Sequence, residues 1–377
     1  MTTYRTAKPE EFLDLIDFAN FVFSHDIVPF DFAKLLPKVY GSDKNTSNIH
    51  KVAVSDDGKL RAEIACLPQT VHVCGRTLRA GFIGTVSVHP RARGEGHMKA
   101  LMNAWIDELR GSCDLSVLGG QRQRYQYFGY THGGEQVAYH ITEPNIRHAL
   151  RGADASPFAF APLAETPGAE ALALSLHNAR PARVEREPAL FTEALSSYGA
   201  RPLAVLKNGR PAGYLAVTDD GKTVQEAAFS DWDDFAPALK AYAAFSGADD
   251  FTVLAPSCDS ELNRRLLAFA EGYRVGPNLS IRIFDFANVL DAYLTLKFET
   301  EGLVPGVFSA VLDGQPVTAR ADANGVTVER AALPGAPELS LLEAQELLLT
   351  IESRYSPVKT PAGWFPLPLF WYNADNF

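Results

Sequence analysis

The most informative stretch of the sequence is Val86-Ser-Val-His-Pro-Arg-Ala-Arg-Gly-Glu-Gly-His-Met-Lys99. Its residue types predict a strand that turns at the proline and continues into a helix. The two glycines permit positive φ and let a ligand approach the backbone closely. The N–H groups at the helix N-terminus, together with the arginines and the lysine, favour a polyanion such as a pyrophosphate. An ordinary strand-to-helix turn with surface arginines is the alternative, because a glycine pair alone is weak evidence.

The size and charge of the chain narrow the classes of function. A chain of 377 residues is longer than a domain with a single hydrophobic core usually is, so we expect two or three domains. A net charge of −10 disfavours nucleic acid and anionic membranes as partners and favours cationic molecules. Four cysteines without a CxxC pair do not indicate a disulfide framework. Without a signal-like N-terminus or a run of about 18 apolar residues, we expect a cytoplasmic protein.

Hydrophobic periodicity predicts three units of mixed helix and strand. In the first unit, helical spacing covers residues 10–23 and 98–109. Residues 149–167 are rich in Ala, Pro and Gly and predict a linker, and a second unit and then a third follow it. Because hairpins and helices are mixed within each unit, the predicted class is α+β, or mixed α/β. The strands expected in the first unit are residues 51–55, 60–67, 69–73, 80–88 and 115–118.

Residues 86–99 also resemble the acyl-CoA-binding signature of GNAT acetyltransferases, V-x-P-x-x-R-x-x-G-x-G/A. Val88, Pro90, Arg93 and Gly96 match it, whereas Met98 stands where the signature has Gly or Ala. A register that starts at Arg91 satisfies R-x-x-G-x-G but spoils the proline spacing. The resemblance implies acetyl-CoA as co-substrate, bound by residues Val86, Ser87, Val88, Arg93, Gly94, Glu95, Gly96, His97, Met98 and Lys99.

The bulky residue at position 98 makes the chain look like the enhanced intracellular survival (Eis) family of acetyltransferases. Tyr125-Gln-Tyr-Phe-Gly-Tyr130 is similar to that family's Tyr-x-x-Phe-Gly-Tyr segment, and the chain ends on an aromatic residue, Phe377, as family members often do. The resemblance implies a GNAT domain over residues 1–148 and a degenerate GNAT-like domain over 160–286. It further implies a sterol-carrier-like domain over 288–377 and a homo-oligomer, such as a hexamer.

The resemblance also implies roles for particular residues. An acid must protonate the departing thiolate, and tyrosine suits this because its reference pKa of ~10 exceeds the ~8.5 of a thiol. Tyr130 matches the expected acid, a buried core tyrosine is the alternative reading, and Tyr125 and Tyr127 stay open as candidates. The terminal carboxylate of Phe377 is the implied base, which requires the apolar tail to enter the first domain's site. Asp26 falls where the family has an acidic substrate-facing residue, although a surface aspartate is equally consistent.

The predicted function is therefore acetyl transfer from acetyl-CoA to a primary amine, by direct attack of the amine. The acceptor is expected to be a cationic small molecule resembling an aminoglycoside, or a lysine side chain. A lipid- or sterol-carrier role for the third unit, with the other units as scaffold, is the alternative. An RNA-binding role for the Gly-, Arg- and Tyr-containing residues 119–134 is weaker, since the chain is acidic. His25, His89 and His97 lack paired metal-ligand spacing, so no metal is expected.

Overall fold

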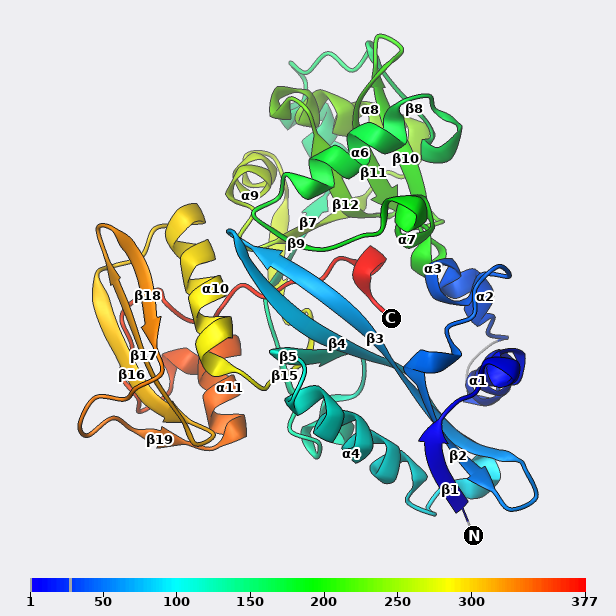
Figure 1. Ribbon diagram of the computed structural model, residues 1–377. Helices are drawn as coiled ribbons and strands as arrows, with labels where there is room; N and C mark the ends of the chain where they lie inside the picture. Colours follow the sequence, from blue (N-terminus) through cyan, green and yellow to red (C-terminus); the bar gives the residue numbers. More distant parts are fainter. Residues whose placement is uncertain (1, 27–28) are drawn as a thin grey trace.

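The computed structural model describes residues 2–26 and 29–377, except for the side chain of Asp26. Within these residues the strands form three sheets of eight, seven and four strands (Figure 1). The predicted mixed α/β class is confirmed. No helix of the described chain is long and apolar enough to cross a membrane.

The first sheet is built around a long hairpin of two strands, β3 and β4. The sequence predicts two strands at 60–67 and 69–73, whereas β3 is one strand that pairs with β4 along its length. Pro68 is tolerated within β3 because it lies between the stretches of β3 that pair with β2 and with β9. In sheet order the strands are β1 (Thr2–Thr6), β2 (His50–Ser55), β3 (Leu60–Val73), β4 (Arg76–Val88), β5 (Leu115–Leu118), β15 (Leu279–Ile283) and β6 (Thr131–Gly133), with β9 (Ala182–Val184) beside β3.

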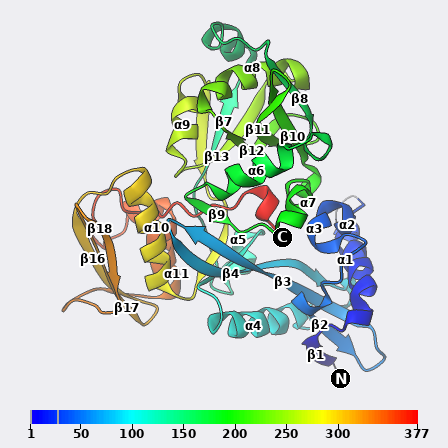
Figure 2. The ribbon, with the colours of Figure 1, turned by 45° about the horizontal axis from the view of Figure 1, so that its top comes forward.

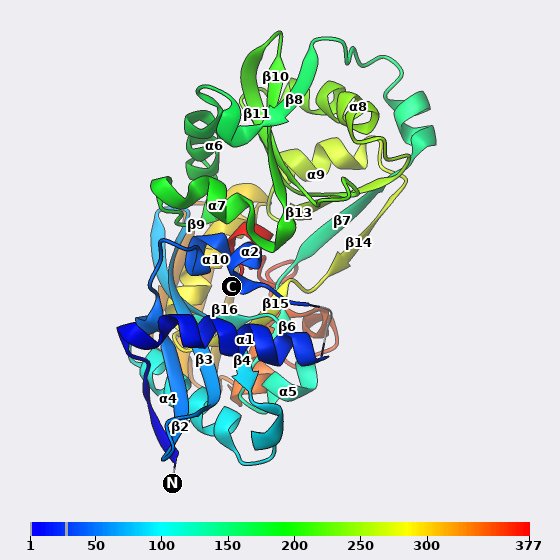
Figure 3. The same ribbon diagram turned by 90° about the vertical axis from the view of Figure 1, so that its right-hand side faces the viewer.

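Helices cover both faces of the first sheet. The long N-terminal helix α1 (Phe12–Asp26) crosses one face, followed by the short helices α2 (Phe32–Leu35) and α3 (Pro37–Tyr40) (Figure 3). Helix α4 (His97–Arg110) covers the other face. The predicted apolar stripe of α4 is confirmed, because all of its members are buried: Leu101, Met102, Trp105, Ile106 and Leu109.

The second sheet repeats the strand order of the first. In each sheet four antiparallel strands are followed by one parallel pair, β4–β5 in the first and β12–β13 in the second. A helix connects the strands of each parallel pair, namely α4 and α8. The second sheet contains β8 (Phe158–Pro162), β10 (Arg201–Lys207), β11 (Arg210–Val217), β12 (Thr223–Phe229), β13 (Phe251–Pro256), β7 (Gln136–Ile141) and β14 (Gly272–Gly276). Its helices are α6 (Ala169–Asn178), α7 (Phe191–Leu195), α8 (Phe235–Ser246) and α9 (Ser260–Leu267).

Two strands cross between the units that the sequence predicts. Strand β7 follows β6 in the chain but pairs with β13 and β14 of the second sheet. Strand β15 follows β14 but pairs with β5 and β6 of the first sheet. The expected linker at 149–167 is also corrected, because it contains β8, which pairs with β10. Local periodicity indicates that a segment is a strand, but it does not indicate which sheet the strand joins. The sequence therefore does not predict the sheets to which β7, β8 and β15 belong.

The third sheet consists of β18 (Gly325–Glu329), β17 (Gln315–Asp322), β16 (Gly306–Leu312) and β19 (Glu338–Leu339). Helix α10 (Phe286–Thr300) is buried on nearly every side. It packs with residues of the first and third sheets in one hydrophobic core. A helix in such a position is apolar all round and lacks a clear amphipathic period. Helix α11 (Leu341–Leu349) precedes the tail.

The C-terminal tail returns from the third sheet to the middle of the molecule (Figures 1 and 2). It ends close to α2, α3 and the β3–β4 hairpin, far along the chain from all of them (Figure 3). Most of its large side chains are buried: Trp364, Phe365, Leu367, Leu369, Trp371, Tyr372 and Phe377.

Candidate functional site

The candidate site begins at a β-bulge in β4. Ala65 pairs with Gly84 and Glu63 pairs with Ser87, so two residues of β4, Thr85 and Val86, lie opposite one residue of β3. Thr85 has φ of 49°, which is unusual for a β-branched residue. β4 pairs with β5 over residues 80–83 only, so β4 and β5 part just before the bulge. A bulge of this kind redirects side chains beside active sites.

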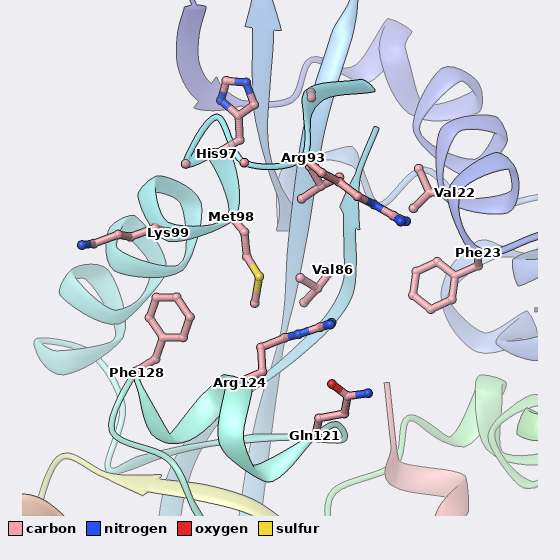
Figure 4. Close-up of a pocket in the computed structure, with 14 residues that line it drawn as sticks. Val22, Phe23, Val86, Arg93, His97, Met98, Lys99, Gln121, Arg124 and Phe128 are labelled. Atoms are coloured by element: carbon pink, nitrogen blue, oxygen red, sulfur yellow. The ribbon is translucent and has the colours of Figure 1, made fainter. Parts of the chain in front are cut away.

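A cavity of about 770 Å³ lies where β4 and β5 part (Figure 4). Eight of the ten residues predicted to bind acetyl-CoA line it: Val86, Val88, Arg93, Gly94, Gly96, His97, Met98 and Lys99. Ser87 is instead buried on the opposite face of β4, and Glu95 faces Arg61 and His97 outside the cavity. Sequence reasoning missed the rest of the lining, which comes from α1, the turn before α4 and the segment around α5 (Arg122–Gln126): Val22, Phe23, Ala92, Gln121, Arg124 and Phe128.

The turn before α4 has the backbone that the sequence predicts. Gly94 and Gly96 have φ of 88° and 85°, and Gly96 is the N-cap of α4. The first N–H groups of a helix have no partner within it, so this end of α4 presents donors and partial positive charge to the cavity. Arg93 and Arg124 extend from opposite sides of the cavity and add full positive charge (Figure 4). The arrangement suits a phosphate-bearing ligand.

Two of the lining residues contribute mainly through their backbone. The Lys99 ammonium lies 5.3 Å from the centre of the Tyr127 ring, and its side chain turns away from the cavity (Figure 4). The His97 ring lies 2.9 Å from Tyr4 Oη and 3.0 Å from Glu95 Oε2. Met98 points into the cavity at the position where the signature has a small residue (Figure 4).

The three candidate tyrosines differ in their surroundings. Tyr130, the predicted acid, is buried, and its hydroxyl lies 2.8 Å from Ser116 Oγ; neither Tyr130 nor Tyr125 is among the residues that line the cavity. Burial raises the pKa of Tyr130, and Ser116 donates onward to the Gly81 carbonyl, so this hydroxyl is held within the sheet. The Tyr125 ring packs on Gly120, where β5 has just ended, and Tyr125 follows the cavity-lining Arg124. Tyr127 is two-thirds exposed.

The C-terminal residue lies against β4 next to the bulge. A Cβ atom added to Gly84 would lie 2.7 Å from the terminal oxygen of Phe377 and 2.8 Å from its carbonyl carbon. The Phe377 ring packs against the rings of Tyr40 and Phe82, with centroids 6.1 and 6.5 Å apart. The tail therefore enters the N-terminal unit, and its carboxylate stands two residues along β4 from the cavity-lining Val86.

Donors from three separate segments hold the end of the tail. Lys38 Nζ donates to the Ala374 carbonyl (2.5 Å), and Gln69 Nε2 donates to the Asp375 carbonyl (2.6 Å). Arg186 makes two hydrogen bonds to the buried Asp375 carboxylate, at 2.7 and 3.0 Å. Desolvation lowers the pKa of the Lys38 ammonium to about 7. Contacts of this number and depth oppose the fraying that is usual at a chain terminus.

The remaining predicted residues are placed as follows. Asp26 ends α1, but its side chain lies outside the described residues. The His89 ring stacks on that of Phe18 and meets that of Phe21 at a tilt, and His97 bonds Tyr4 and Glu95. Within residues 2–26 and 29–377, no group of three or more His, Cys, Asp or Glu side chains that could hold a metal ion is found.

The second sheet lacks an equivalent of the cationic turn. The segment between β12 and α8 is Ser230-Asp-Trp-Asp-Asp234, with three carboxylates where the first unit has arginines and glycines. Asp231 instead caps the following turn, by accepting from the backbone N–H of Asp233. A pyrophosphate would be repelled there, so the site belongs to the first unit.

Comparison with known proteins agrees with this geometry. Residues 3–133 match the family model described as acetyltransferase (GNAT) domain, about a third of the chain. No curated protein sequence matches the chain.

Three solved structures share the fold over nearly the whole chain. The first is a probable N-acyltransferase from Enterococcus faecalis (17% identity, 97% of this chain and 95% of that one, TM-score 0.67). The second is Eis1 from Mycobacterium abscessus (15% identity, 100% of both chains, TM-score 0.63). The third is a GCN5-related N-acetyltransferase from Kribbella flavida (17% identity, 91% and 89%, TM-score 0.62). Residues 3–133 therefore form a GNAT acetyltransferase domain, which makes this protein an acetyltransferase enzyme.

Proposed function

We propose that the protein transfers an acetyl group from acetyl-CoA to a primary amine of a cationic acceptor, either a small molecule resembling an aminoglycoside or a lysine side chain. The observation that carries this proposal is the position of Gly84, Thr85 and Val86 along one strand. Val86 lines the cationic cavity, and Gly84 touches the terminal carboxylate. The donor thioester and the acceptor amine would thus meet at the bulge between them.

The terminal carboxylate of Phe377 is proposed to bind the acceptor as its ammonium and to take part in removing its proton. The neutral amine then attacks the thioester carbonyl carbon, and the carbon–sulfur bond breaks. A carboxylate held in a partly desolvated site attracts a cation more strongly than one in water does. Asp26, whose side chain lies outside the described residues, is proposed to bind the acceptor, as the family resemblance implies.

Tyr125 is proposed as the acid that protonates the departing thiolate, in place of Tyr130. Both hydroxyls are buried, and burial raises the pKa of both. The Tyr130 hydroxyl is engaged with Ser116 beneath α4. The Tyr125 ring lies at the open end of β5, next to Gln121 and Arg124 of the cavity wall. Tyr125 is therefore placed better than Tyr130 to reach the sulfur of a thioester that enters between β4 and β5.

The wider organisation is proposed to follow the Eis-like plan. The repeated strand order of the first two sheets supports a GNAT domain with a degenerate GNAT-like partner, and the third sheet with α10 and α11 would be the sterol-carrier-like domain. A homo-oligomer such as a hexamer, and a cytoplasmic location, stay predictions. A lipid-carrier role is not favoured, because the 770 Å³ cavity is lined by residues between 22 and 128.

Binding of CoA tests the donor site directly. Calorimetry on the wild-type protein should detect CoA binding in the micromolar range, and Arg93→Glu should weaken it at least tenfold, because it reverses a charge that faces the phosphates. Arg91→Glu is the matched control, since Arg91 is exposed in the same turn and does not line the cavity. Wild-type protein that binds no CoA would refute the proposed function.

A further inference from the structure

A chain of buried polar side chains starts at the β4 bulge and leads into the sheet. Thr85 Oγ1 lies 2.7 Å from Tyr40 Oη, and Tyr40 Oη lies 3.3 Å from His50 Nε2. His50 Nδ1 lies 2.8 Å from Glu63 Oε2. With the proton of neutral His50 on Nδ1, each group donates to the next, from Thr85 to Glu63. All four side chains are at most 6% exposed.

The chain starts at the point where the reactants are proposed to meet. Thr85 stands between Gly84, which touches the terminal carboxylate, and Val86, which lines the donor cavity. Because Thr85 has a positive φ and lies in the bulge, its side chain leaves the regular strand direction and its hydroxyl points to Tyr40. The Tyr40 ring also packs on the Phe377 ring. The chain and the tail thus share one wall of the acceptor site.

Glu63, at the inner end of this series of hydrogen-bonded side chains, can accept a proton. Glu63 is fully buried, and its Oε1 has no hydrogen-bond partner among the described residues. Ser87 Oγ, directly across the β3–β4 pair from Glu63, is likewise buried without a partner. A carboxylate oxygen left without a donor is costly, whereas a protonated Glu63 could donate to a nearby acceptor. Desolvation raises the pKa of Glu63, so a proton that reaches this carboxylate is held more strongly than it would be in water.

We propose that Thr85, Tyr40, His50 and Glu63 form a proton relay that carries the acceptor's proton away from the bulge. This inference rests on the proposed function. The ammonium N–H bond breaks, and its electron pair stays on nitrogen. The proton passes to Thr85, the Thr85 proton to Tyr40, and the Tyr40 proton to His50 Nε2, while the Nδ1 proton of His50 moves to Glu63. One proton leaves the amine, and the negative charge of Glu63 is neutralised.

The relay complements the terminal carboxylate instead of replacing it. A terminal carboxylate has a reference pKa of about 3.5 and is a weak base near neutral pH, so it is better suited to holding the ammonium. An imidazole, with a reference value near 6.5, is closer to what a general base requires. Titratable groups near Tyr40 include Tyr198, whose pKa is raised by burial, and the carboxylate of Phe377, whose ring packs on that of Tyr40.

The test is the pH dependence of acetylation, with spermidine as the acceptor. Tyr40→Phe and Glu63→Gln should lower kcat about 100-fold at pH 7, in the range of general-base effects. The loss should shrink to less than tenfold near pH 10, where much of the amine is neutral without help. Thr85→Ser should retain more activity than Thr85→Val, because it keeps the hydroxyl. Tyr293→Phe, a buried tyrosine of α10, is the control and should behave as wild type.

CoA binding separates the possible outcomes. Each relay variant should bind CoA with wild-type affinity, which also reports that it is folded. A loss of kcat that is equal at pH 7 and pH 10, with CoA binding intact, would assign these residues a purely structural role and overturn the relay. Wild-type protein that binds CoA but acetylates neither spermidine, nor an aminoglycoside, nor a lysine-bearing peptide would contradict the proposed function and, with it, the relay.

Discussion

Tyr125 and Tyr130 illustrate how much depends on the environment of one hydroxyl. The two residues stand in the same short motif, and both are aromatic, buried and close to the candidate site. Their rings meet edge to face, with centroids 6.5 Å apart. The two side chains differ in what they contact. The Tyr130 hydroxyl points to Ser116, whereas the Tyr125 ring packs against Gly120 at the end of β5. A motif cannot encode this difference, since it depends on where β5 ends in space.

The assignment of the acid can be tested by removing each hydroxyl. Tyr125→Phe should lower kcat by about 100-fold while CoA binding is unchanged, because a general acid acts in the transition state. Tyr130→Phe should lower kcat less than fivefold and reduce stability by about 1 kcal/mol, the usual cost of one lost hydrogen bond. Steady-state kinetics and thermal unfolding of both variants provide the measurement. If Tyr130→Phe is the variant with the larger loss of kcat, the acid is Tyr130.

At the scale of the element, the tail behaves as a fixed part of the first sheet's face. Its last residues receive hydrogen bonds from α3, from β3 and from Arg186, which follows β9. Arg186 and Asp375 are both buried, and Arg186 also bonds Glu226 of β12. Removing one member of a buried ion pair typically costs about 3–5 kcal/mol, so the tail is joined firmly to the second sheet. The position of the carboxylate is thus set by several units together.

Gly84→Ala tests whether that position matters. The new Cβ would lie within 2.8 Å of the terminal carbon and oxygen of Phe377, so the end of the tail must move. Misplacement by about 1 Å can reduce turnover up to 100-fold, and we expect a loss of at least tenfold with CoA binding intact. Gly111→Ala is the control, because its φ of −90° suits alanine and the nearest atom to its Cβ lies 4.0 Å away. Residues appended after Phe377 should be as harmful as Gly84→Ala, and full activity of such a protein would place the amine-binding carboxylate elsewhere.

At the scale of the whole molecule, the charge around the cavity differs in sign from the net charge of the chain. The chain carries a net charge of −10, yet the donor cavity has Arg93, Arg124 and the N-terminus of α4 around it. The proposed anionic donor would therefore be attracted locally, whereas the proposed cationic acceptor would be attracted by the molecule as a whole. The terminal carboxylate beside Gly84 adds a local charge of the sign that the acceptor needs.

Salt should therefore affect the acceptors differently. Raising the ionic strength from about 0.05 to 0.5 M shortens the Debye length to a few ångströms and weakens long-range steering. We expect kcat/KM for a polyamine to fall several-fold over this range, while kcat/KM for an amine that is uncharged at the assay pH changes little. Steady-state kinetics at fixed, saturating acetyl-CoA measures this. Equal salt dependence for both amines would argue against selection of the acceptor by charge.

The local features of the cavity wall follow from the amino-acid sequence alone. The strand, the proline turn, the two positive-φ glycines and the amphipathic α4 all lie within about 25 residues and depend on interactions between neighbours in the chain. Their residues therefore predicted the conformation, and they are also the basis for proposing that it binds a polyanion. The tail is also rich in large apolar residues, and most of these are buried in the structure.

Contacts between segments that lie far apart in the sequence are seen only in the tertiary structure. The exchange of β7 and β15, the wall formed by Gln121 and Arg124, and the chain from Thr85 to Glu63 join residues that no local pattern connects. The hydrogen bond from Gln69 to Asp375 spans 306 residues. Such contacts form when apolar surfaces of different units pack together and leave water. Side-chain periodicity shows which face of an element is apolar, but it does not show which other element that face will pack against.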